Sequence, residues 1–225
     1  MENHNIQIVQ ECIEQIFNAK RFERIYDYYS MQCVLHTPPY VGLGIFPDDS
    51  SGEHLVIKSV AANGPAAGRV MVGDELLRAQ DANGTWEGFD QLRTGLWGQG
   101  KLGTEVKLTL LRDGETIDVT LARGRVEGFD STIIEVLDTW RHDLQEEIPD
   151  LKTEIDQIMA AGDRVAFFAT NTGTNVRYHQ SAVWTECDIM RLENGKIVEW
   201  WGVEDQLSRM LQLGFRLSEP VREPV

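Results

Sequence analysis

DIMRLENGKIVEWW, residues 188–201, alternates polar and apolar side chains on either side of Asn194-Gly195. Asn-Gly is the strongest short-range signal for a two-residue type I′ turn, because both residues tolerate a positive φ. The stretch therefore predicts a β-hairpin in which Glu193 pairs with Lys196.

The register of this hairpin follows from its turn. Provided that no bulge intervenes, side chains alternate between two faces with a period of two. One face is then expected to carry four cross-strand pairs: Asp188–Trp201, Met190–Glu199, Glu186–Val203 and Trp184–Asp205. The opposite face is expected to carry Cys187, Ile189, Val198 and Trp200.

The first face gathers carboxylates next to indole rings. In a dry cavity, burial would raise the pKa of such a carboxylate, which suits a general acid or base. Alternatively, the face is solvated or turned toward another subunit, and its carboxylates only favour solubility. The periodicity is equally compatible with both interpretations.

Long strands and helices surround the hairpin. Alternation predicts the strands Leu151–Met159, Arg164–Gly173, His179–Glu193 and Lys196–Val203, followed by a helix over Asp205–Leu213. Upstream, an apolar stripe predicts a helix with Ile134, Leu137, Trp140 and Leu144 on one face. Thr132 and Glu135 have the spacing of a capping box at its start. Near the N-terminus, apolar spacing predicts helices over residues 6–17 and 22–29, then a short strand over 33–37.

Residues 41–126 differ in texture from both flanks, being rich in Gly and in short strand-like runs. Asp113-Gly114 separates two alternating stretches and predicts a second hairpin. This segment holds 12 acidic and 9 basic side chains, so most of the net charge of −15 falls on the flanks. We therefore expect two domains: a discontinuous one formed by 1–40 and 127–225, and an insert formed by 41–126.

Motifs in the insert resemble a bacterial PDZ domain of the HtrA or C-terminal-processing type. They are the GLGI sequence at 42–45, GPAA at 64–67, VGDELL at 72–77, and the hairpin from Gly103 to Gly114. The resemblance implies binding of a protein C-terminus or an extended segment by strand addition. Its carboxylate would lie on the amides of the loop formed by Gly42, Leu43, Gly44 and Ile45.

The resemblance also places a groove helix near Phe89–Trp97, lined by Phe89, Arg93 and Leu96 if these share one face. Pro47 departs from the pattern, because proline offers no backbone donor where the added strand would pair. The alternative is a structural insert that has lost its ligand or is filled by its own polypeptide.

The flanking domain resembles the SnoaL-like branch of the nuclear transport factor 2-like superfamily. The matching motifs are LHTP at 35–38, IPDL at 148–151, AGDRV at 161–165, GTN at 173–175, DIMRLENGKIVEWW at 188–201 and QLG at 212–214. The resemblance implies an α+β fold in which a cone-shaped, curved antiparallel sheet wraps on helices. It also implies a homodimer paired through the outer sheet face.

In SnoaL-type cyclases an aspartate works without a cofactor, removing a proton next to a carbonyl so that the enolate attacks a second carbonyl. The matching residue here is Asp205, with Asp188 as runner-up and His36 as a polar partner. Other roles are open for each residue: Asp205 as an N-cap, His36 as a core histidine, and Asp188 as an acceptor for an indole.

The cavity implied by the resemblance would be lined by Trp201, Glu199, Met190, Trp184, Trp140 and Tyr28. Its expected substrate is a small carbonyl compound, polyketide-like, handled by a lyase or isomerase. The sequence departs from the cyclase pattern at two points: Asn175 replaces the usual His of the family's GTH motif, and the loop after it is short. The alternative is a non-enzymatic ligand-binding or adaptor protein.

Composition excludes several other classes. A net charge of −15 disfavours nucleic acid and anionic membranes as partners. The three cysteines, Cys12, Cys33 and Cys187, have no CxxC spacing, so neither a disulfide framework nor a metal site is expected. The first residues lack a signal-peptide pattern, so we expect a cytoplasmic protein, and no cofactor motif is present.

Overall fold

Two separate hydrophobic cores divide the protein. The computed structural model describes residues 2–48 and 51–216. One core belongs to a host unit, Met1–Thr37 with Asp130–Val225, and the other to an inserted unit, Pro38–Phe129. Both units combine strands with few helices, so the fold class is α+β, as the sequence indicates.

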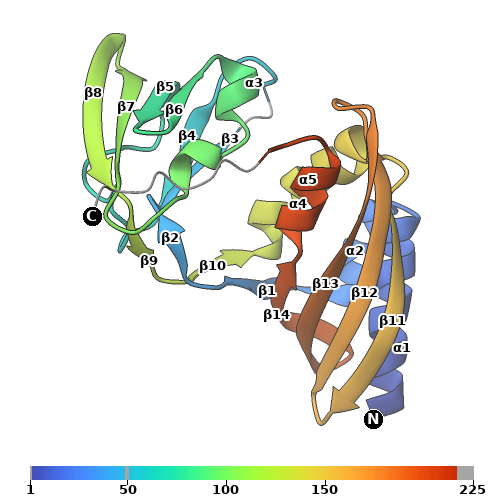
Figure 1. Ribbon diagram of the computed structural model, residues 1–225. Helices are drawn as coiled ribbons and strands as arrows, with labels where there is room; N and C mark the ends of the chain where they lie inside the picture. Colours follow the sequence, from blue (N-terminus) through green and yellow to red (C-terminus); the bar gives the residue numbers. More distant parts are fainter. Residues whose placement is uncertain (1, 49–50, 217–225) are drawn as a thin grey trace, which may run out of the picture. The chain divides into compact units, whose positions relative to one another are not determined.

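The host unit is built on a mixed six-stranded sheet in the order β10-β1-β14-β13-β12-β11 (Figure 1). Its strands are β1 (Tyr29–Thr37), β10 (Phe129–Thr132), β11 (Lys152–Ala161), β12 (Arg164–Asn175), β13 (Gln180–Glu193) and β14 (Lys196–Glu204). The four last strands form a curved antiparallel meander, whereas β1 lies parallel to β14.

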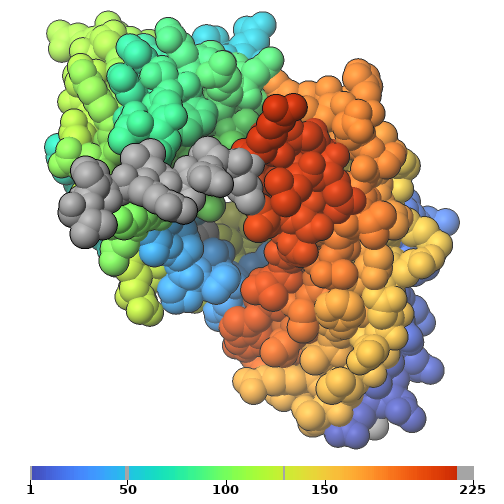
Figure 2. All heavy atoms as spheres, in the orientation of Figure 1, coloured from blue at the N-terminus to red at the C-terminus, as the bar shows by residue number. Residues whose placement is uncertain are grey.

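Helices cover this sheet. They are α1 (Glu2–Cys12) with its π-helical continuation η1 (Ile13–Asn18), the 3₁₀ turn η2 (Phe22–Arg24), α2 (Ile25–Tyr28), α4 (Ile133–His142) with η4 (Asp143–Glu147), and α5 (Gln206–Gln212). Helix α1 packs on β11 and β12, and α5 on β13. Helix α5 buries no residue and lies on the surface of the unit (Figure 2).

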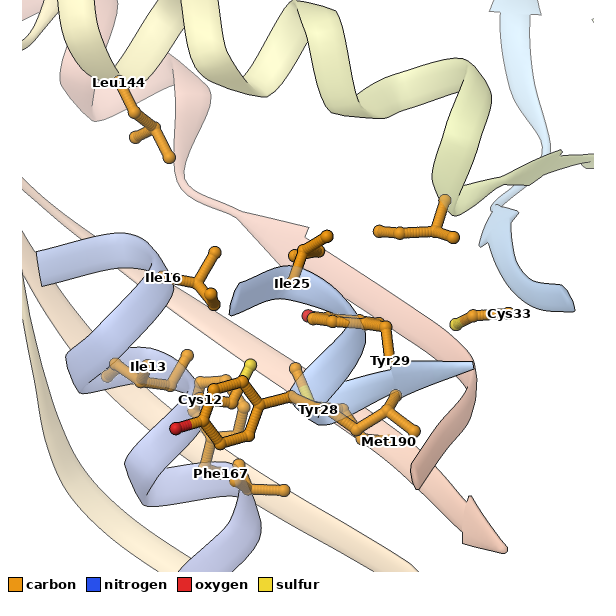
Figure 3. Close-up of a cluster of buried hydrophobic side chains, with 14 of the residues drawn as sticks. Cys12, Ile13, Ile16, Ile25, Tyr28, Tyr29, Cys33, Leu144, Phe167 and Met190 are labelled. Carbon is orange, nitrogen blue, oxygen red and sulfur yellow. The ribbon is translucent and has the colours of Figure 1, made fainter. Parts of the chain in front are cut away.

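The core of the host unit lies between α1 and the inner sheet face. Figure 3 shows Cys12, Ile13 and Ile16 facing Phe167 of β12 and Met190 of β13. Alternate residues of β12 and β13 are buried here, as expected for strands with one face on a core. The outer face of the sheet exposes large apolar side chains: Met159, Phe168, Ile189 and Val203.

Helix α4 begins as the sequence predicts. The Glu135 amide donates to Thr132 Oγ1 at 3.4 Å, and the Thr132 amide donates to Glu135 Oε2 at 2.7 Å, which completes the capping box. The predicted apolar stripe is wrong at one position. Ile134 is exposed and Ile133 is buried instead, because Ile133 lies four residues before Leu137 and so shares its face of the helix.

The inserted unit holds a sheet in the order β3-β4-β5-β7-β8, with β6 paired to β5. Its elements are β2 (Tyr40–Gly42), β3 (Ile45–Asp48), β4 (Val56–Val60), β5 (Glu75–Asp81), β6 (Gly84–Glu87), α3 (Phe89–Leu92), η3 (Leu96–Gly98), β7 (Glu105–Arg112), β8 (Glu115–Ala122) and β9 (Gly124–Val126). Strands β2 and β9 pair with each other where the insert begins and ends. Asp113 and Gly114 both have positive φ, so the predicted β7–β8 hairpin is confirmed.

Candidate functional site

The β13–β14 hairpin carries a bulge that changes its predicted register. Glu193 pairs with Lys196 and Leu192 with Ile197, as expected, but Arg191 pairs with Glu199. Val198 is therefore an extra residue, and beyond it every β14 side chain switches to the other face. Asp188 lies opposite Gly202 rather than Trp201. The predicted pairing is therefore wrong for all β14 residues after Val198.

Asp188 points to the buried face of β13 and is only 4% exposed. Its pKa is raised to about 8, first because burial disfavours the charged carboxylate, then because Glu186 is close and of like charge. The indole of Trp200 opposes this rise, since its N–H favours the carboxylate form. That N–H is buried and falls short of full hydrogen-bond geometry with any described residue.

Two further carboxylates share this face with Asp188. Burial raises the pKa of Glu186, and a hydrogen bond from Asn171 acts in the opposite direction. Asn171 is itself held by the Thr153 hydroxyl, 2.5 Å from its Oδ1. Glu204, opposite Glu186 on β14, accepts a hydrogen bond from Trp184 Nε1 at 2.8 Å. The inner face thus combines acids with polar groups that fix their orientation.

Aromatic rings from four elements, including Trp200 of β14, form one connected group. Trp140 of α4 meets Trp200 edge-on at 5.0 Å between centroids and lies 5.5 Å from Phe17 of η1. Tyr29 of β1 meets Trp140 at 6.1 Å. We name Phe17, Tyr29, Trp140 and Trp200 the aromatic cluster. It makes the surroundings of Asp188 apolar, which agrees with the direction of its pKa shift.

The expected pocket residues divide between the two sheet faces. Met190, Trp184 and Trp140 lie on the side of Asp188. Trp201 and Glu199 lie on the opposite face, because the bulge at Val198 turns them there. The remaining expected residue, Tyr28, is buried in the core, with the Arg24 guanidinium 5.6 Å from its ring centroid.

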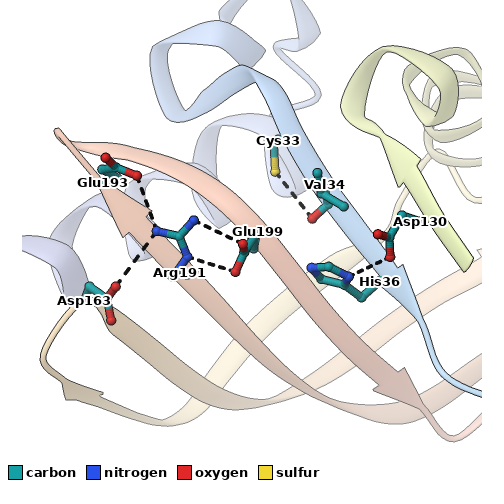
Figure 4. A network of polar contacts seen from close by, with 8 residues as sticks. All are labelled: Cys33, Val34, His36, Asp130, Asp163, Arg191, Glu193 and Glu199. Atoms are coloured by element: carbon teal, nitrogen blue, oxygen red, sulfur yellow. Dashed lines mark hydrogen bonds and ion pairs between the residues drawn. The ribbon is translucent and has the colours of Figure 1, made fainter. Parts of the chain in front are cut away.

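His36 also lies on the face opposite Asp188. It pairs with Trp201 across β1–β14 and stacks on its ring at 4.4 Å. Its Nδ1 lies 2.7 Å from Asp130 Oδ1 (Figure 4). On the same face, Arg191 donates to both oxygens of Glu199, at 2.8 and 3.1 Å. The expected partnership of His36 with the base is therefore wrong, since the sheet separates His36 from Asp188.

Asp205 is exposed and has the alternative role expected for it, that of a helix N-cap. It is the N-cap of α5, and its Oδ1 accepts the Ser208 amide at 2.9 Å. The sequence favours Asp205 over Asp188, whereas in the structure Asp188 is the buried carboxylate of the two. Two residues near Asp188, Trp200 and Gly202, were not expected there. Only the bulge brings them to this face, and no sequence signal marks it.

The GLGI loop of the inserted unit is shaped by its second glycine. Gly44 has a φ of +74°, a conformation that favours glycine. Leu43 is buried, and its carbonyl accepts the Ala66 amide at 3.0 Å. Burial raises the pKa of Tyr40, and a hydrogen bond from the Gly44 amide to its hydroxyl acts in the opposite direction. One amide of the predicted carboxylate loop is thus engaged by the domain itself.

The groove helix is shorter than expected. α3 spans Phe89–Leu92, and Gly95 then takes a left-handed conformation with a φ of 69°, so Leu96 belongs to the separate turn η3. Arg93 lies over the Phe89 ring at 5.7 Å. The expected single helix with Phe89, Arg93 and Leu96 on one face is therefore wrong. Strand β3 stands at one end of the sheet order β3-β4-β5-β7-β8.

Residues 2–48 and 51–216 contain neither a grouped metal site nor a helix suited to span a membrane. No group of His, Cys, Asp and Glu there has an arrangement that would hold a metal ion. No helix in the same ranges is both long and apolar enough to cross a membrane.

Comparisons with known proteins identify both units. Residues 135–213 match the family of SnoaL-like polyketide cyclases, and residues 40–122 match the PDZ domain. No curated protein matches the sequence significantly. Among solved structures, IdmH from Streptomyces antibioticus, a proposed polyketide cyclase, is 14% identical, with a TM-score of 0.49. The match covers 94% of this protein and 99% of IdmH.

Two other solved structures are similarly distant. A proposed SnoaL-like polyketide cyclase from Jannaschia sp. is 12% identical, with 96% of this protein and 95% of that one covered and a TM-score of 0.46. An LEH-like epoxide hydrolase of M. tuberculosis is 10% identical, with 94% and 90% covered and a TM-score of 0.42. These likenesses are too distant to transfer a function.

Proposed function

Because the protein has a SnoaL-like polyketide cyclase domain and a PDZ domain, we propose that the host unit moves a proton next to a carbonyl group of a small apolar compound. Asp188 is the acid and base of this reaction. The observation that carries the proposal is a carboxyl group 4% exposed, with a pKa of about 8, beside the aromatic cluster. A base whose pKa lies near the working pH is the most efficient proton-transfer group.

The proposed reaction needs only this carboxyl group and the substrate. Ionised Asp188 takes a proton from the carbon next to the carbonyl, and the electron pair moves onto the carbonyl oxygen as an enolate. The enolate carbon attacks a second carbonyl of the same molecule, forming a carbon–carbon bond and an alkoxide. Asp188 then returns its proton to the alkoxide. The reaction is an intramolecular aldol-type cyclisation, and the aromatic cluster offers flat apolar surface to a polyketide-like substrate.

Exchange of carbon-bound protons tests the first step without knowledge of the natural substrate. We expect the protein in D₂O to catalyse deuterium incorporation next to the carbonyl of planar 1,3-diketones, followed by proton NMR. The rate is expected to rise with pH and to reach half its maximum near pH 8, because only ionised Asp188 is a base.

Two results would separate the alternatives. A pH profile that follows the buffer blank alone would contradict catalysis. Diketone binding in the absence of any exchange would instead favour a ligand-binding protein, the second function that the sequence allows.

We propose further that the inserted unit binds the C-terminus of a partner protein along β3. Three observations support this role: the match to the PDZ domain, the GLGI loop at 42–45 and the left-handed Gly44. An incoming carboxylate would take the Gly44 amide from the Tyr40 hydroxyl. Donors to one side of a strand recur every second residue, so a ligand held at Ile45 next meets Pro47, which has no N–H.

Replacing Pro47 by Val should strengthen this binding. The change restores one backbone donor on an edge strand, which is worth about 0.5–1.5 kcal/mol, or roughly two- to tenfold in affinity. Fluorescence anisotropy with a C-terminal peptide library measures the gain, and the same peptides with amidated ends are the control. Equal affinity for free and amidated ends would exclude carboxylate capture. Carboxylate-dependent binding that Pro47→Val leaves unchanged would exclude strand addition.

A further inference from the structure

Gly202 lies directly opposite Asp188 on the neighbouring strand. A Cβ atom at position 202 would lie 2.2 Å from Asp188 Oδ1 and 3.2 Å from Trp200 Nε1. The first distance is far below van der Waals contact, so the carboxylate occupies the space that any other residue would fill. Gly202 is not among the residues with positive φ, so its backbone would accept alanine. The space, and not the backbone, requires glycine here.

The indole nitrogen of Trp200 is the second polar atom near the Cβ position of residue 202. Its ring is held edge-on by Trp140 at 5.0 Å and by Phe17 at 6.3 Å. Its Nε1 is buried and completes no hydrogen bond within the described residues. The Asp188 oxygen and the indole nitrogen are both neighbours of the Cβ position at residue 202. The Asp188 carboxylate is therefore the nearby acceptor to which the indole N–H can donate.

We propose that Gly202 and Trp200 are positioning residues that hold the Asp188 carboxylate beside an indole donor. This inference rests on the proposed function of Asp188. Gly202 has no side chain, which leaves room for the Asp188 carboxylate. The indole N–H of Trp200 stabilises the ionised form of Asp188 that acts as base. The other titratable groups that act on Asp188 are Glu186 of β13 and Glu204 of β14. Tyr29 of β1 is coupled to it as well.

Two variants are expected to move the titration of Asp188 in the same direction by different routes. Gly202→Ala displaces the carboxylate from the indole, and Trp200→Phe removes the donor. In both, the ionised form loses a charge-assisted hydrogen bond. Such a bond corresponds to an upward shift of about one to two pH units.

Gly173→Ala is the matched control. Gly173 also lies in a strand of this sheet without a positive φ, but its Cβ would lie 2.4 Å from Ile148 Cγ2. The control crowds an apolar contact and leaves the surroundings of Asp188 unchanged. It is expected to lower stability without moving the Asp188 titration.

The titration is read by carbon-13 NMR of the full-length protein labelled at its aspartate carboxyl groups, with Asp188→Asn identifying the signal. An upward shift in Gly202→Ala and Trp200→Phe, absent in Gly173→Ala, is expected. An Asp188 titration unchanged in Trp200→Phe would overturn the inference, even if Gly202→Ala fails to fold. This readout needs no turnover. Shifted titrations without any deuterium exchange would therefore support the positioning role while refuting the proposed function.

Discussion

Replacing Asp188 by Asn is expected to lower deuterium exchange by about 100-fold or more and, at the same time, to make the protein more stable in mildly alkaline solution. Asn keeps the shape of the side chain but cannot take up a proton from carbon. The same burial that suits Asp188 to proton transfer makes its ionised form costly to the fold. One substitution should therefore separate activity from stability.

The sign of the stability effect follows from the two pKa values. Folding raises the pKa of Asp188 from 3.8 to about 8. Between these values the unfolded protein has lost the proton that the folded protein still holds. Rising pH therefore favours unfolding by about 1.4 kcal/mol per pH unit for this group. Because an amide does not ionise in this range, the Asp188→Asn variant should lack this contribution.

Urea unfolding at several pH values between 5 and 8, followed by hydrogen exchange of the host-unit strands β12–β14, measures the difference between parent and variant. Asp205→Asn is the control, because Asp205 is an exposed helix cap. It should keep both the exchange activity and the pH slope of the parent. Parallel slopes for the parent and Asp188→Asn would show that Asp188 is ionised in the folded protein, and the proposed base would lose its support.

In the inserted unit, Asp81→Asn is expected to cost about 3–5 kcal/mol of stability, because it leaves a buried guanidinium without its counter-charge. Arg123 Nη2 donates to Asp81 Oδ2 at 2.8 Å, and the two side chains are 1% and 4% exposed. The same nitrogen donates to the Trp97 carbonyl at 2.7 Å. The pair thus joins β5, η3 and the end of β8. Asn can retain the Oδ1 contacts to the turn amides of Asn83 and Gly84, so the change removes the charge and the Oδ2 acceptor that faces Arg123.

Asp118→Asn provides the matched control. Asp118 forms an ion pair with Lys107 at the same distance, 2.8 Å, but both side chains are about half exposed. Solvent screens such a pair, so the control should leave stability nearly unchanged. Hydrogen exchange followed by mass spectrometry resolves the two units, which a single unfolding curve would mix. Similar protection of β5–β8 in both variants would show that the buried pair does not stabilise the unit.

Local signals in the sequence predicted most elements of the fold. Asn194-Gly195 and Asp113-Gly114 form the expected hairpin turns, with all four residues at positive φ. The strands Arg164–Asn175 and Gln180–Glu193 begin or end within two residues of the expected positions. These features depend on neighbours in the sequence, so one sequence on its own is enough to reveal them.

The candidate site was predicted only on one strand. Trp184, Glu186, Asp188 and Met190 share a face because nothing interrupts the alternation of β13. On β14, Trp200 and Trp201 are adjacent and equally apolar, so composition does not distinguish the inner residue from the outer one. His36 was expected near the base because no local signal reveals the face on which a parallel partner strand presents its side chains.

Turn chemistry and period-two alternation are local, so the amino-acid sequence is enough to predict that acids and indoles share a two-stranded ribbon. Which acid faces which indole depends on the folded sheet. Because of the extra residue at Val198, Trp200 and Gly202 lie on the sheet face of Asp188. Trp201 and Glu199 lie on the opposite face, which is the face of His36. A bulge depends on how the whole ribbon curves against β1 and β12, and a one-residue slip exchanges the two faces of a strand.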